Sequence, residues 1–269
     1  MPRATTTERS RPMKRTRNGI LIPDVPIMAG GNLPNVVKGV SAGGNDWKKH
    51  AVDMGLPSGT LWADCDIDVN MPDGFCVTPF IYEKSFFSWG NVQGYNPIAE
   101  SFKTVYNWGS ANAAEPWYDG QPYGNTEGNT LTGDIPVGKE FDAACANLGA
   151  PWRMPRSTEF QELIDNCIYI DADGVEVTAA DKRVMVNGVM GLYLQSRING
   201  SRLFFATTGY GRDTSWLDHD INGHYWSGNY NSARNAGAMA FSANGVFPQN
   251  TGDSRAFGFA VRAVMNLSM

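Results

Sequence analysis

The sequence predicts a mixed α+β fold, and three observations support that prediction. A strand–turn–strand pattern stands near residue 51, two amphipathic helical segments follow around residues 139–167, and short strands joined by turns extend from Ile168 onward. This order of elements favours segregated helices and antiparallel strands over a doubly wound parallel sheet.

Composition and length limit the number of domains and the kind of partner. A chain of 269 residues with 42% hydrophobic and 12% aromatic residues fits one sizeable globular domain with extensions. The formal net charge of −5 argues against a nucleic-acid or anionic-membrane surface on the main domain.

Residues 1–45 differ from the rest and are expected to form an arm for attachment or oligomerisation. The first 17 residues hold six basic side chains against Glu8 alone, so this tail either binds nucleic acid or a membrane or is a disordered docking arm. Prolines in Ile20–Met28 indicate an extended or edge segment, and glycines at 29–32 and 42–45 indicate joints. This segment lacks the apolar region of a signal peptide, and no later apolar run is long enough to span a bilayer. The sequence therefore predicts that the protein is retained in a cytoplasm.

The folded domain is expected to span residues 46–269. Residues Ala51–Ala63 read as a strand, a Pro-Ser-Gly turn and a second strand, and Phe86–Gly90 reads as a short aromatic strand. Residues 91–135 are polar and rich in Asn, Gly and Tyr, which indicates a long ordered loop with a functional or interface role.

Two helices are predicted next. In Lys139–Leu148 the apolar residues recur at helical spacing, and Gly149 stands at the stop position. Thr158 and Gln161 match a capping box for a helix that ends near Cys167. The core-facing residues of the two segments are Phe141, Ala144, Cys145, Leu148, Phe160, Leu163 and Ile164.

The remaining chain is expected to be β-rich. Asp171–Glu176 reads as a β-turn rather than a calcium loop, because it lacks the length and the closing Glu of such a loop. The predicted strands are Gly191–Gln195, Leu203–Thr207, His224–Ser227, Ala238–Ser242 and Phe257–Val264.

The four cysteines, Cys65, Cys76, Cys145 and Cys167, lack metal-type spacing. Without an export signal, free buried thiols are expected. A disulfide between Cys65 and Cys76 across a loop is the alternative.

Several of these segments together resemble a known fold family. Val52–Trp62, Phe87–Gly90, Trp152–Leu163, Tyr225–Ser227 and Gly258–Val264 occur in the order seen in the C-type lectin fold, in the branch that includes formylglycine-generating enzymes and many gut-bacterial and phage surface proteins. The resemblance covers residues 47–269. It implies an α+β domain with two helices and a mostly antiparallel, irregular β half.

Within that branch the C-terminal third, about residues 213–264, is similar to the variable proteins of diversity-generating retroelements. Those systems mutate template adenines, so an AAC or AAT codon can become a codon for Asp, His, Tyr, Ser, Thr, Gly, Arg or Phe but never for Lys, Gln, Glu, Met or Trp. The resemblance implies ligand-binding variable positions that belong to the allowed set: Asp218, His219, Asp220, Asn222, Tyr225, Asn229, Tyr230, Asn231, Ser232, Arg234, Asn235, Phe247, Asn250, Thr251, Asp253, Ser254 and Phe257.

Fixed residues should hold these positions in place. Trp216, Trp226, Met239 and Gln249 lie outside the allowed set, and with Trp152 and Arg262 they are assigned to the scaffold. The alternative is that Asn, Gly, Ser and Asp are simply good turn formers. That alternative accounts less well for Phe247 and Phe257, which are aromatic residues in polar turn segments.

No catalytic residue, metal ligand or cofactor is assigned. Formylglycine-generating enzymes use a pair of C-terminal cysteines, but the last cysteine here is Cys167. His219 and His224 with nearby aspartates could ligate a metal, but we interpret them as variable-loop residues. A triad of Ser215, His219 and Asp213 lacks a nucleophile elbow.

The expected function is receptor binding, most directly at the tip of a phage tail against a protein or glycan on the host cell. The arm would join the domain to other particle proteins or make it a homo-oligomer such as a trimer. A bacterial surface or fimbrial adhesin of fixed specificity and a structural baseplate protein are the alternatives.

Overall fold

The computed structural model describes residues 14–15, 21–22, 47–94, 131–139, 141–212, 215–232 and 234–266. The chain divides into two units, Met1–Leu33 and Pro34–Met269. In the first unit, β1 (Lys14–Arg15) pairs antiparallel with β2 (Leu21–Ile22). The rest of the predicted arm and most of the predicted loop at 91–135 lie outside the described residues.

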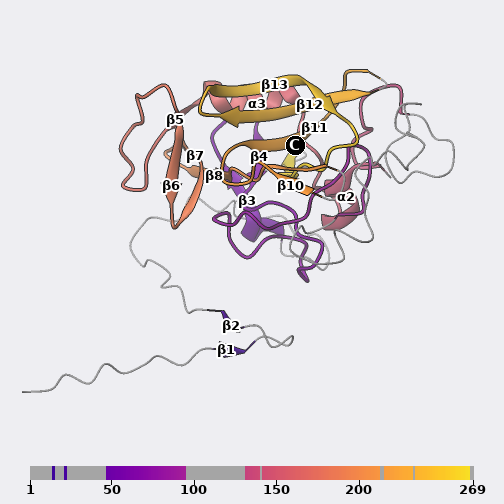
Figure 1. The fold of residues 1–269 in the computed structure, drawn as a ribbon, viewed down its shortest axis with the longest axis horizontal. Coiled ribbons are helices and arrows are strands. Elements are labelled where there is room, and N and C mark those ends of the chain that lie inside the picture. Colours follow the sequence, from indigo (N-terminus) through magenta and orange to yellow (C-terminus); the bar gives the residue numbers. More distant parts are fainter. Residues whose placement is uncertain are drawn as a thin grey trace, which may run out of the picture. The chain divides into compact units, whose positions relative to one another are not determined.

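The second unit begins with η1 (Trp47–His50), followed by β3 (Ala51–Asp53) and β4 (Thr60–Ala63). The two strands pair antiparallel, which confirms the predicted strand–turn–strand unit. Strand β14 (Val264–Asn266) pairs with the other edge of β4, so the end of the chain completes this three-stranded sheet (Figure 1).

Helix α2 (Ala143–Leu148) confirms the first predicted helix over a shorter range. It begins later than the periodic pattern because Asp142 caps it, its carboxylate accepting hydrogen bonds from the amides of Ala144 and Cys145. Gly149 ends it with a φ of 75°, in the left-handed region that glycine adopts without a steric cost.

Helix α3 (Ser157–Asp165) lies where the second helix was predicted, but the predicted Thr158/Gln161 capping box is wrong. The Glu159 carboxylate accepts from the Arg156 amide at 2.8 Å, and the Asn229 amide oxygen accepts from the Ser157 amide at 2.7 Å. The helix ends at Asp165, near Cys167 as predicted. The cap thus combines a local side chain, Glu159, with Asn229 from a distant strand.

Four strands form an antiparallel sheet with β7 (Val189–Ser196) at its centre. Its partners are β5 (Cys167–Tyr169), β6 (Arg183–Val186) and β8 (Arg202–Ala206). The loop after β5 is the expected turn, since the Asp171 carboxylate accepts from the amides of Asp173 and Val175.

The C-terminal half adds a two-stranded pair, β9 (Tyr210–Arg212) with β10 (Ser215–Leu217), and a three-stranded antiparallel sheet. That sheet has the order β11 (Gly223–Tyr230), β12 (Asn235–Ser242), β13 (Gly245–Ser254), as Figure 1 shows.

Strand β13 was not predicted, because a segment rich in Pro, Asn, Gly and Asp has low strand propensity. Its pairing along β12 overrides that preference.

The predicted strand Phe257–Val264 is wrong over most of its length. Residues Gly258, Phe259 and Ala260 each form only an isolated bridge, to Gly211, Phe87 and Tyr225 respectively, and β14 begins at Val264. The short strand predicted at Phe86–Gly90 is likewise reduced to bridging residues, among them Phe87 opposite Phe259. These segments lie between sheets and pair with different neighbours in turn.

A cluster of charged residues lies in the core. The Asp66 carboxylate accepts hydrogen bonds from Lys84 Nζ and Arg262 Nε, and all three side chains have no exposed surface. Arg262 also donates to the carbonyl oxygens of Ala63 and Phe204, at 3.1 and 2.9 Å. Arg262 therefore joins β4 to β8.

The four cysteines are free, as predicted; three of them are buried, and Cys145 is half-buried. Among the described residues, no helix is both long enough and apolar enough to cross a membrane. The described architecture is mostly antiparallel β-sheet with two α-helices, which confirms the α+β class at that level.

Candidate ligand-binding surface

The sheet β11–β12–β13 has two faces with different surroundings. On one face Tyr225 stands opposite Met239, and both belong to a core cluster that includes Phe160 and Leu163 of α3. Helix α3 therefore covers this face.

The other face carries three cross-strand rows. Their members are His224–Ala240–Phe247, Trp226–Ala238–Asn250 and Tyr230–Ala236–Asp253. Residues directly opposite one another in an antiparallel sheet project to the same side. Three of the predicted binding residues, Phe247, Asn250 and Asp253, are thus brought onto one face along the edge strand β13.

These three residues are accessible to different degrees. The Phe247 side chain is 50% exposed, which is unusual for a large aromatic group. Asn250 and Asp253 are half-buried, and the Asn250 amide donates to an Asp253 carboxylate oxygen at 2.7 Å.

An aromatic chain connects this face to the core. Trp226 stacks on Phe259 with ring centroids 4.1 Å apart, and the centroids of the Phe259 and His224 rings are 4.7 Å apart. The Tyr210 ring packs against both His224 and Phe257, with centroid distances of 5.4 and 5.2 Å respectively. A buried aromatic core thus supports the half-buried rings of Tyr210 and Phe257.

Tyr210 and Arg212 are candidate binding residues that sequence reasoning missed. The Arg212 guanidinium lies over the Phe257 ring at 5.7 Å, and Tyr210 packs against the same ring. Both residues precede the predicted variable region, so the codon argument did not reach them. A Tyr-Gly-Arg strand beside a polar loop is the one sequence signal that could have indicated them.

The loop at residues 218–222 is held by hydrogen bonds within the loop and by one to Thr207. The Asp220 amide donates to the Thr207 carbonyl oxygen at 2.8 Å, and the Asn222 side-chain amide donates to Asp218 at 3.2 Å. Asp218 and Asp220 have φ values of 54° and 61°, a conformation that Asp tolerates better than most residues. His219 is exposed and stacks on Trp216 at 4.2 Å.

The turn between β11 and β12 carries the next group of candidates. The Asn231 amide donates to the Thr251 carbonyl oxygen at 2.6 Å, which joins the turn to β13. The Ser232 hydroxyl accepts from the amides of Arg234 and Asn235. Arg234 and Thr251 are exposed, while Asn235 and Ser254 are half-buried and stand opposite each other.

Burial changes the pKa of three groups near this surface. It raises the pKa of the Asp253 carboxyl to about 6 despite the hydrogen bond from Asn250, and it lowers the pKa of His224 to about 4. The pKa of Tyr210 is raised by burial and by the negative charge of Asp218.

Two predicted binding residues have structural positions instead. Tyr225 has no exposed surface, and its hydroxyl donates to the Ala206 carbonyl oxygen at 2.9 Å, so its assignment to the binding surface is corrected to the core. Asn229 is half-buried. Its side-chain oxygen accepts a hydrogen bond from the Ser157 backbone amide, and its side-chain amide donates to the Asp134 carboxylate at 3.0 Å. Both were selected by codon type, which carries no information on the direction of a side chain.

The scaffold residues divide in a similar way. Trp152, Trp226, Met239 and Arg262 are buried, as expected of a frame. Trp216 is half-buried and donates from Nε1 to the Thr208 carbonyl oxygen at 2.7 Å. Gln249 is exposed, and its side-chain amide donates to the Gln161 side chain of α3 at 3.2 Å. It is therefore not part of the packed frame.

The candidate surface combines several kinds of side chain. It offers exposed or half-buried rings, guanidinium groups, amides and carboxylates at the surface of a rigid sheet. Asp213, part of the triad considered above, lies outside the described residues. A scan against protein-family models, a search of curated proteins and a search of solved structures each found no match.

Proposed function

We propose that this protein binds a receptor on a host cell through a diversified surface carried by a domain of the C-type lectin fold. One observation supports this most directly. The exposed and half-buried candidates lie along the edge strand β13 and in the adjoining turns, while Trp152, Trp226, Met239 and Arg262 are buried.

The chemistry of the surface fits recognition of varied partners. Phe247, Phe257, Tyr230 and Tyr210 offer aromatic area with few rotatable bonds, and Arg234 offers a guanidinium group. Asn, Ser and Asp side chains supply adaptable hydrogen bonds. Surfaces selected for variety commonly combine rigid aromatic anchors with short polar groups.

In this proposal the domain is displayed at the tip of a phage tail, joined to the particle by residues 1–45. Display of several copies, for example as a trimer, would raise the avidity of a shallow surface without any new contact. No catalytic step, metal ion or cofactor is required for this binding.

Population sequencing of the codons for residues 210–264 tests the proposal. We expect substitutions at Phe247, Asn250, Asp253 and the 230–235 turn, and constancy at Trp226 and Met239. The structure sharpens the test at Tyr225, whose codon type permits variation but whose burial forbids it. A uniform frequency of substitutions across residues 210–264 would contradict diversification. It would favour an adhesin of fixed specificity or a structural role.

A further inference from the structure

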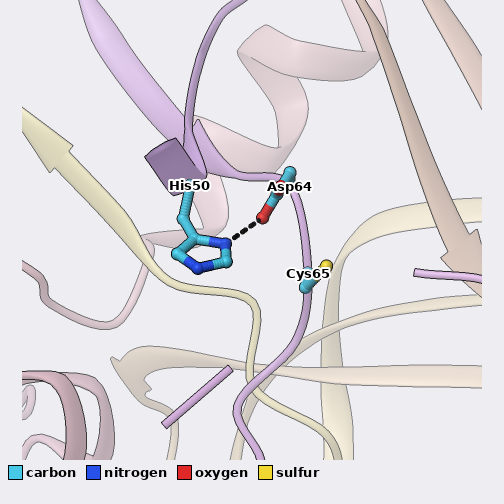
Figure 2. A group of neighbouring side chains, drawn as sticks. All are labelled: His50, Asp64 and Cys65. Atoms are coloured by element: carbon cyan, nitrogen blue, oxygen red, sulfur yellow. Dashed lines mark hydrogen bonds and ion pairs between the residues drawn. The ribbon is translucent and has the colours of Figure 1, made fainter. Parts of the chain in front are cut away.

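His50 and Asp64 face each other at the end of the β3–β4 pair. Ala51 stands opposite Ala63, so the next residues outward are also neighbours, and the Asp64 amide donates to the His50 carbonyl oxygen at 2.9 Å. His50 Nδ1 lies 2.8 Å from Asp64 Oδ1. Cys65 follows directly, and the three possible ligand atoms lie within 4.8 Å of one another (Figure 2).

The imidazole ring is fixed in this position by its surroundings. It stacks on Phe75 with ring centroids 4.1 Å apart. Its other nitrogen, Nε2, is buried without a hydrogen-bond partner among the described residues and lies 3.5 Å from Asp73 Oδ2. The ring therefore has a carboxylate at each nitrogen.

Each neutral tautomer of His50 leaves one ring nitrogen with its lone pair facing a carboxylate: Nε2 faces Asp73 when the proton is on Nδ1, and Nδ1 faces Asp64 when the proton is on Nε2. If the ring proton is on Nε2, facing Asp73, the Nδ1 lone pair points at a carboxylate oxygen 2.8 Å away. Two acceptors at that distance repel each other unless a proton or a metal ion lies between them. A carboxylate behind the second nitrogen is also the arrangement that orients metal-binding histidines.

We propose that His50, Asp64 and Cys65 form a zinc site, with Nδ1, a carboxylate oxygen and Sγ as its ligands and Asp73 orienting the ring. Nitrogen, oxygen and thiolate sulfur are the donors that zinc binds, and three protein ligands leave the fourth position to solvent. Zn–N and Zn–O bonds of about 2 Å require His50 Nδ1 and Asp64 Oδ1 to separate by a few tenths of an ångström.

The sulfur ligand loses its proton in this step. Burial raises the pKa of the Cys65 thiol, so the free protein holds it as S–H. Binding breaks the S–H bond, forms the S–Zn bond and releases the proton to solvent, with no change in oxidation state.

A metal ion in this site would cross-link two segments. His50 is the last residue of η1, the first described element of the second unit, while Asp64 and Cys65 directly follow β4. The backbone carbonyl oxygen of Asp64 also accepts a hydrogen bond from Arg262 at 3.1 Å. This role is independent of the proposed receptor binding, because none of the site's ligands belongs to the candidate binding surface.

Cobalt(II) tests the assignment, since a cobalt–thiolate bond gives a charge-transfer band in the near ultraviolet. The full-length protein, treated with a chelator and then titrated with Co²⁺, is compared with Cys65→Ala and His50→Gln. We expect the band in the wild type, its loss in Cys65→Ala and weaker cobalt binding in His50→Gln. Zinc should displace the cobalt and raise the Tm of the wild type but not of Cys65→Ala or His50→Gln.

Cys167→Ala is the matched control, because Cys167 is also buried and has a thiol pKa raised by burial, to about 12. It should keep both the band and the rise in Tm. Circular dichroism establishes that each variant is folded. A wild type without the band, or a band that survives in Cys65→Ala, would overturn the proposal.

Discussion

Asp66 is a buried carboxylate that pairs with two buried cations, Lys84 and Arg262. Burial alone would raise the pKa of its carboxyl, but Arg262 and Lys84 outweigh that effect, and the pKa is lowered. One buried carboxylate thus compensates two buried cations, and neither cation can reach water because all three side chains have no exposed surface.

Asp66→Asn should therefore destabilise the fold strongly. Removal of one partner leaves buried charge uncompensated, which costs about 3–5 kcal/mol. Urea unfolding measures the change. Asp181→Asn is the control, since the Asp181–Arg183 pair is partly exposed and should contribute less than about 1 kcal/mol. Equal effects of the two substitutions would contradict the role given to Asp66.

Asp253 should give the protein a measurable pH dependence. Its folded-state pKa of about 6 lies above the ordinary value of 3.8, so the folded state holds this proton more tightly. The stability it contributes is present below about pH 4 and is lost as the pH rises to about 6.

Asp253→Asn should remove this loss, and the variant should exceed the wild type in unfolding free energy at pH 7 by about 1–2 kcal/mol. Urea midpoints of both proteins, measured from pH 4 to pH 7, test this expectation. A difference that does not change over this range would mean that Asp253 is not desolvated.

At the scale of elements, helix α3 and the sheet β11–β12–β13 depend on each other. Asn229 of β11 caps the helix, and residues of α3 pack against the face that holds Tyr225 and Met239. The cap therefore joins α3 to β11, in the sheet whose edge strand β13 carries Phe247, Asn250 and Asp253.

Asn229→Ala should destabilise the protein by about 1–2 kcal/mol, because it removes the acceptor for the first amide of α3. Asn231→Ala serves as the control, since its bond to Thr251 is exposed and its loss should cost little. Thermal or urea unfolding separates the two. If both substitutions have the same small effect, Asn229 does not act as a cap.

At the scale of the whole molecule, the second unit contains the described core. The principal buried clusters extend from Ala51 to Met265, and β14 near the end of the chain pairs with β4 near the start of this unit.

Deletion of residues 1–33 should change the stability of the second unit by less than about 0.5 kcal/mol, because the buried clusters of the described residues all lie between Ala51 and Met265. Differential scanning calorimetry and urea unfolding measure this. A large fall in stability would show that the first unit packs on the second.

The sequence by itself determined the features that depend on local patterns. Apolar residues at helical spacing located both helices, and the turn at Pro57–Gly59 located the β3–β4 pair. These features are encoded by residues close together in the chain.

The tertiary structure decided what depends on distant partners. Strand β13 exists because β12 pairs with it, the α3 cap comes from Asn229, and Tyr225 is buried although its codon type resembles that of exposed neighbours. His50 and Asp64 meet because the register of two strands places them side by side. Composition and codon type give the kind of side chain at a position, but only packing determines which way that side chain points.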